Sequence, residues 1–115
     1  MPPSAPSRTL RTPQDLLDAG LIAPAQLSAI AAVEERYATA IPPAFLDLIE
    51  TPDDPIGAQV IPSPAELDAA PHELADPIGD DALSPVPGIV HRHSDRAPLK
   101  PLLVCPPYCR FCFRR

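Results

Sequence analysis

Prolines are the feature that most limits how this chain can fold. Nineteen of them are spread through the 115 residues. A proline removes a backbone donor and breaks the interior of a helix, so only short helices are compatible with this distribution. Proline suits the first turn of a helix, however, because its missing N–H would have no partner there. The sequence therefore predicts a mainly α fold of short helices with long irregular, proline-rich segments.

Helix signals begin at residue 12. Thr12 is a suitable cap, Pro13 suits the first helical position, and Gly20 offers a stop for this short helix. Pro24 begins a second, longer helix that we expect to reach about Tyr37. Its expected apolar positions are Leu27, Ile30, Ala31 and Ala38, and its expected solvated positions are Glu34, Glu35 and Arg36.

Further helix signals follow up to residue 75. A third helix is predicted to begin at Pro42–Pro43 and to run to about Glu50, with Phe45, Leu46 and Ile49 on one face. We expect residues 56–61 to be extended or irregular. The run Ser63-Pro-Ala-Glu66 forms a capping box with proline at the first helical position, and predicts another short helix.

The chain accordingly divides into four expected parts. Residues 1–11 form a flexible N-terminus, residues 12–75 a helical region, and residues 76–98 an irregular segment punctuated by proline and glycine. Residues 99–115 hold a strand, about Leu99 to Val104, and a loop with all the cysteines. Two prolines, Pro98 and Pro101, weaken this strand because proline cannot donate to a ladder.

Composition excludes several classes of protein. The net charge of −6 argues against a non-specific nucleic-acid binder, which would carry a basic patch. No apolar stretch approaches the roughly 20 residues that span a bilayer. The N-terminal residues lack the apolar core of a signal peptide. We therefore expect a cytoplasmic protein with no nucleic-acid or membrane partner.

All three cysteines, Cys105, Cys109 and Cys112, are spaced C-x3-C-x2-C. Thiolates are soft ligands, and such short spacings suit iron–sulfur clusters, copper(I) and zinc. A 4Fe-4S cluster normally takes four cysteines, so three would leave one iron open to a substrate or cofactor.

Other interpretations of the cysteines remain open at this point. A zinc site with three thiolates could be completed by water or by His91 or His93. The pair Cys109 and Cys112 also forms a C-x-x-C motif, typical of dithiol redox centres. The simplest alternative is a set of unpaired thiols near a chain end.

Upstream residues carry a more specific signal. Asp76-Pro-Ile-Gly-Asp80, Ser84-Pro-Val-Pro-Gly-Ile-Val-His91 and the ending Cys109-Arg-Phe-Cys-Phe-Arg-Arg115 occur in order at similar gaps to those of one family. From about Arg36 to Arg115 the chain resembles the lysine 2,3-aminomutase family of radical S-adenosylmethionine (SAM) enzymes. The resemblance favours the cluster over zinc or a redox pair.

This resemblance implies an isomerase that converts L-lysine to β-lysine with a 4Fe-4S cluster, SAM and pyridoxal phosphate (PLP). It implies that Cys105, Cys109 and Cys112 are the cluster ligands and that Phe111 lies near the adenosyl group. Arg114 matches the family arginine that binds the substrate carboxylate, a role that suits the bidentate guanidinium. Family members are expected to be homo-oligomers.

The resemblance also implies features that this chain lacks. A parallel α/β barrel needs about 200 residues or more, and only its first strand is expected here. The PLP-binding lysine would lie downstream, and Lys100, the only lysine, is expected to be a solvated charge instead. We therefore expect an N-terminal fragment of the enzyme that is inactive alone, with a labile, substoichiometric cluster because its loop is unsupported.

Two alternatives differ in function. One is a fragment of the related enzyme that β-lysylates elongation factor P, whose cluster loop has a similar ending. The other is a non-catalytic module that binds iron–sulfur or a partner through exposed apolar surface.

Overall fold

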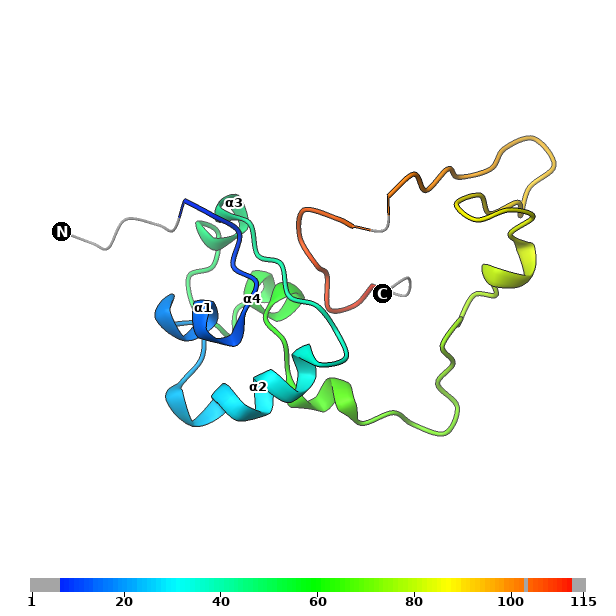
Figure 1. Cartoon of the computed structure of the whole chain (residues 1–115). Helices are drawn as coiled ribbons and strands as arrows, with labels where there is room; N and C mark the ends of the chain where they lie inside the picture. Colours follow the sequence, from blue (N-terminus) through cyan, green and yellow to red (C-terminus); the bar gives the residue numbers. More distant parts are fainter. Residues whose placement is uncertain (1–6, 103, 113–115) are drawn as a thin grey trace. The chain divides into compact units, whose positions relative to one another are not determined.

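The computed structural model describes residues 7–102 and 104–112. Within these residues two compact units can be distinguished: one runs up to Ala69 and includes Pro106–Cys112, and the other is Ala70–Cys105. Short helices make up the first unit, whereas the second is mostly irregular (Figure 1). The described residues contain isolated β-bridges and no strand. The prediction of a mainly helical chain with long irregular segments is confirmed.

Helix α1, Pro13–Asp18, forms as its sequence predicts. Thr12 Oγ1 accepts a hydrogen bond from the Asp15 N–H at 3.1 Å, and Asp15 Oδ2 accepts one from the Thr12 N–H at 3.0 Å. This reciprocal capping satisfies donors that the first turn leaves without partners. Gly20 follows the helix with a φ of 73°, a left-handed conformation that glycine adopts without strain.

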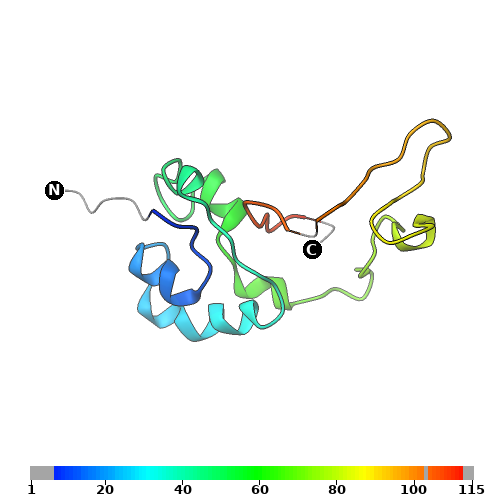
Figure 2. The same cartoon turned by 45° about the horizontal axis from the view of Figure 1, so that its top comes forward.

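The second predicted helix is shorter than expected. A 3-10 turn, η1 (Pro24–Gln26), leads into α2 (Leu27–Glu34). The buried face of α2 comprises Ile30 and Val33, while Ala31 and Ala38 are exposed, so the predicted apolar face was wrong in part. Helix α2 contacts α1, and Figures 1 and 2 show the two side by side.

Two of the next predictions need correction. Helix α3 spans only Pro43–Leu46, short of the expected end near Glu50. Most of residues 56–61, which were predicted to be extended or irregular, belong to helix α4, Pro55–Val60. The cause is local: Asp54 caps this helix by accepting a hydrogen bond from the Gly57 N–H at 2.7 Å, and Pro55 occupies the first turn.

The core of the first unit lies among these short elements. Leu10 and Ile41 pair as an antiparallel bridge, with N–H to O distances of 2.9 and 3.0 Å, and so bring the N-terminal segment onto the helices. The prediction that Phe45, Leu46 and Ile49 share a face is consistent with their packing against this core. The buried cluster consists of Leu10, Leu16, Leu21, Ile22, Ile30, Ile41 and Val60.

The capping box at residue 63 produces η2, a 3-10 helix over Pro64–Leu67. Ser63 and Glu66 exchange the predicted hydrogen bonds, and Glu66 Oε1 lies 3.0 Å from the Ser63 nitrogen. Because η2 contacts α2, the Glu66 side chain is fixed at a defined place on the first unit.

Side-chain contacts to the backbone order the second unit. Asp76 accepts hydrogen bonds from the N–H groups of Asp80 and Asp81, at the start of η3 (Asp81–Leu83). Arg92 pairs with Asp80 at 2.8 Å and donates to the Ile78 carbonyl. The segment predicted to be irregular therefore holds one short 3-10 helix and defined turns.

The expected strand over Leu99 to Val104 is not formed in the described residues. Leu99 makes one isolated bridge, to Ile89, and Leu103 lies outside the described residues. A strand needs a neighbour for its backbone groups, and none of the described residues supplies a second strand. No helix of the described chain is long and apolar enough to cross a membrane.

The first prediction concerns Gly57. A Cβ atom here would lie 2.4 Å from the Pro52 carbonyl oxygen, a separation that Cβ atoms in proteins essentially never show. We expect Gly57→Ala to destabilise the chain by about 1–3 kcal/mol, as overpacking does. Urea denaturation measures this, with Gln59→Ala, an exposed site in the same helix, as control. Equal unfolding midpoints for Gly57→Ala and wild type would contradict the close approach.

The second prediction concerns Asp15. Its hydrogen bonds from Arg8, Arg11 and Thr12 hold the pKa of this carboxyl well below its usual range. Because the folded pKa is depressed, the stabilisation is complete above the unfolded pKa of about 4 and is lost as the pH falls further. We expect Asp15→Asn to cost about 1–2 kcal/mol at pH 7.

The pH dependence supplies the check. The difference between Asp15→Asn and wild type should shrink when urea denaturation is repeated at pH 3. Asp18→Asn, at an exposed site of the same helix, is the control. A difference that stayed constant between pH 7 and pH 3 would show that the Asp15 charge contributes nothing.

Candidate functional site

The three cysteine thiols are free and exposed. Cys109 and Cys112 belong to the first unit, and Cys105 to the second. The Cys112 N–H donates to the Cys109 carbonyl at 3.2 Å, so these two ligand candidates lie at the ends of one turn. Phe111, within this turn, is 77% exposed and thus available to a bound molecule.

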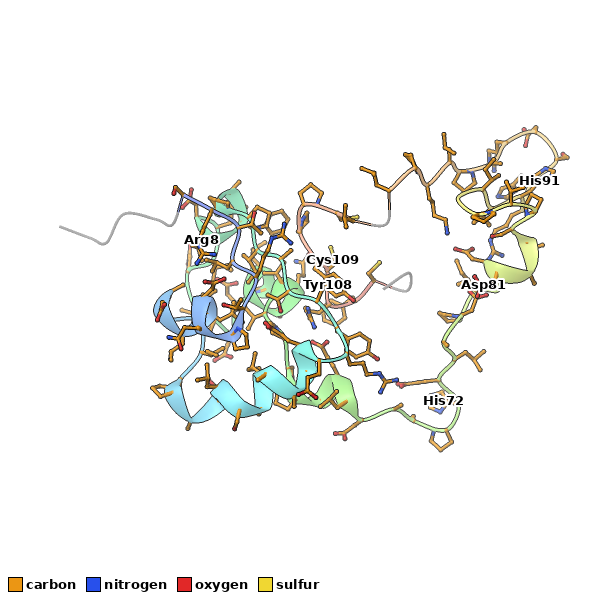
Figure 3. All side chains as sticks on the ribbon, in the orientation of Figure 1. Arg8, His72, Asp81, His91, Tyr108 and Cys109 are labelled. Carbon is orange, nitrogen blue, oxygen red and sulfur yellow. The ribbon has the colours of Figure 1, made fainter. Side chains whose placement is uncertain are left out.

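Backbone hydrogen bonds attach the turn to the helices. The Tyr108 N–H donates to the Ala40 carbonyl at 2.9 Å, and the Arg110 N–H donates to the Gln59 carbonyl at 2.7 Å. Gln59 belongs to α4, and Figure 3 shows Tyr108 and Cys109 beside that helix. The expectation of an unsupported loop is therefore wrong for residues 106–112.

Arg110 is the main side-chain anchor of this segment, and its side chain is only 3% exposed. Its Nε donates to Glu66 Oε1 at 2.8 Å, and its Nη2 donates to Glu66 Oε2 at 2.6 Å. Its Nη1 donates to the Ala38 carbonyl at 2.5 Å, and its guanidinium lies 5.0 Å from the centre of the Tyr108 ring. Parallel bonds to both carboxylate oxygens make a strong, directional pair.

Glu66 serves two purposes at once. Its Oε1 accepts the Ser63 N–H that closes the capping box and also accepts the Arg110 Nε. The hydrogen bond from Ser63 therefore orients the Glu66 carboxylate toward Arg110, independently of the ion pair itself. We call this pair the Glu66–Arg110 latch.

A second carboxyl group lies near the latch. Burial raises the pKa of Glu34, while the Thr39 hydroxyl and the Arg110 guanidinium lower it in part. Glu34 Oε1 and Thr39 Oγ1 are buried without a well-formed hydrogen bond among the described residues. The prediction that Glu34 is solvated was therefore wrong, because this residue is half-buried at the end of α2.

The structure describes some of the other predicted site residues. Arg114 lies outside the described residues. His91 and His93, the candidate zinc ligands, are exposed in the second unit. Lys100 is half-buried, and its backbone N–H donates to the Gly88 carbonyl.

The donor chemistry fits a cluster, because three free, exposed thiols are suitable soft ligands. Across residues 7–102 and 104–112, however, no three His, Cys, Asp or Glu side chains are gathered as a ready-made metal site.

The anchoring role of Arg110 and the second role of Glu66 were not predicted from the sequence. One signal was present, since Arg110 stands between the two cysteines of the C-x-x-C motif. Its partner lies 44 residues away, however, and Glu66 already had a sufficient explanation as a capping residue.

Comparison with known proteins finds curated relatives of one name. No family model matches the chain. It is 46% identical over 78 residues to an L-lysine 2,3-aminomutase of Clostridium subterminale, covering 66% of this chain and 19% of that protein. An L-lysine 2,3-aminomutase of Fusobacterium nucleatum is 41% identical over 83 residues, covering 70% and 20%. One of Escherichia coli is 38% identical over 84 residues, covering 71% and 24%.

The third prediction concerns Glu34. Because burial raises its pKa in the folded state, ionisation of this carboxyl costs stability as the pH rises from the unfolded pKa through the folded pKa. We expect Glu34→Gln to be more stable than wild type at pH 7, with the gain disappearing below about pH 4, near the unfolded pKa.

Urea denaturation at pH 7 and pH 3.5 measures this gain. Glu35→Gln removes the same charge from an exposed neighbour and serves as control. If Glu34→Gln lowered stability at pH 7, the attraction between the Glu34 carboxylate and the Arg110 guanidinium would outweigh the cost of burying the carboxylate.

Proposed function

Because the chain belongs to the lysine 2,3-aminomutase family, we propose that it forms the cysteine-loop part of an enzyme that converts L-lysine to β-lysine. The chain spans about a fifth of the length of the curated relatives described above. One observation carries the proposal: a chain similar to these relatives presents three free, exposed thiols at C-x3-C-x2-C.

In this proposal Cys105, Cys109 and Cys112 hold a 4Fe-4S cluster that leaves one iron open to SAM. When bound, the cluster supplies the electron that cleaves SAM, and PLP carries the migrating amino group. The thiolates bind and orient the cluster. The latch keeps the turn between Cys109 and Cys112 attached to the helices.

Two further residues complete the proposed site. Phe111 precedes Cys112 and exposes its ring, so it can pack against the adenosyl group of SAM. Arg114 would pair with the α-carboxylate of lysine, since a guanidinium makes two parallel bonds to a carboxylate. A radical SAM barrel, a cytoplasmic location and a homo-oligomeric enzyme also belong to this proposal.

Free L-lysine is the substrate we favour over a lysyl residue of elongation factor P. The relatives described above all carry the name L-lysine 2,3-aminomutase. We expect no conversion by the 115-residue chain alone. Orienting bound reactants lowers a barrier only where the groups are held in place, and the proposed PLP lysine is not among these residues.

A chimaera tests the proposal. We expect this chain to replace the corresponding segment of the Clostridium subterminale enzyme and to retain anaerobic β-lysine formation with SAM, PLP and reductant. Amino-acid analysis of the products measures the activity. The chimaera with Cys109→Ala should lose it, because a cluster ligand is gone.

The 115-residue chain alone is the parallel sample, and it should form no β-lysine. β-Lysine from this chain, abolished by Cys109→Ala, would refute the expected inactivity. A folded chimaera without activity would instead favour a non-catalytic module that binds a partner.

A further inference from the structure

The turn between Cys109 and Cys112 is held at several points on one side. Tyr108 and Arg110 donate their backbone N–H groups to Ala40 and Gln59. The Arg110 side chain adds the two bonds to Glu66. All of these partners belong to the first unit, so the contacts lie within one compact body.

Arg110 stands directly after Cys109 and two residues before Cys112. The hydrogen bond from Cys112 N–H to Cys109 carbonyl closes the turn around it. A residue so placed restricts the backbone on both sides. Its buried side chain points to the helices while both thiols remain exposed. Holding Arg110 therefore restrains two ligand candidates without covering them.

We propose that Glu66 is a positioning residue for the cluster ligands, because through Arg110 it holds the Cys109–Cys112 turn in place before any cluster binds. The role in cluster binding rests on the function proposed above. Residues outside the ligand set commonly orient metal ligands, and their loss typically lowers metal affinity by about 10- to 100-fold.

Glu66→Gln isolates the latch from the cap. The glutamine oxygen still accepts the Ser63 N–H, so the capping box of η2 can persist. The variant loses the carboxylate charge and one acceptor, which leaves Arg110 buried without a full counter-charge. Arg110→Lys is the second variant, because it keeps the charge and loses the two-point geometry.

Glu73→Gln is the matched control. Glu73 makes the same type of contact as the capping function of Glu66, accepting the N–H of the residue three positions earlier, Ala70, at 3.2 Å. It removes the same charge from an exposed site of the second unit. An effect that comes only from removing one negative charge should therefore appear in this control as well.

The experiment uses the full chain and two readouts. Amide exchange of the chain without iron should be at least roughly tenfold faster at positions 108 and 110 in both latch variants, which corresponds to about 1.4 kcal/mol. Exchange in α2 should remain unchanged, and so should all exchange in Glu73→Gln. After anaerobic reconstitution with iron and sulfide, a competing chelator should remove iron from the latch variants at about tenfold lower concentration than from wild type.

Each other outcome overturns the proposal in a distinguishable way. Unchanged exchange at Tyr108 and Arg110 would show that the latch does not hold the turn, whatever the function. Faster exchange with equal iron retention would remove the positioning role alone. A wild-type chain that retains no iron would overturn the proposed cluster as well, and leave the latch as a contact of the fold.

Discussion

The pairing of Arg110 with Glu66 is the interaction on which the candidate site depends. It joins a turn between two cysteines to a short helix formed far earlier in the sequence. A buried ion pair of this kind adds little net stability, because both groups lose their hydration. Removing one partner is costly, however, since the other stays buried and uncompensated. The pair therefore selects one arrangement of the turn more than it stabilises the fold.

The elements that support this pair are individually weak. Helices α1 and α4 have six residues each and α3 has four, so none is long enough to be stable in isolation. Caps at Thr12, Asp54 and Ser63 define where α1, α4 and η2 begin. Packing around Ile30 and Val60 then joins them into one unit. Well-capped helix N-termini thus offset part of the stability that a short chain lacks because it buries little surface.

Local signals in the sequence were sufficient for much of this. Thr12-Pro13 and Ser63-Pro64 predicted helix starts that depend only on neighbouring residues. The Asp54-Pro55 start was missed because residues 56–61 lack a clear helical period, although the capping residue precedes them. The partner of Arg110 could not be predicted, because the pair joins segments that lie 44 residues apart in the sequence. The expected roles of Cys105, Phe111 and Arg114 remain predictions from resemblance.

The distance along the chain between the latch partners has a consequence during synthesis. A ribosome adds about 5–20 residues per second, so the 44 residues from Glu66 to Arg110 take roughly 2–9 s to appear. The helical segment can fold in that interval with the Glu66 carboxylate still hydrated. If that segment folds in this interval, Arg110 emerges to meet acceptors at Ala38, Gln59 and Glu66 that are already in place. In that order of events the helical segment forms its binding surface first, and the Cys109–Cys112 turn then docks onto it.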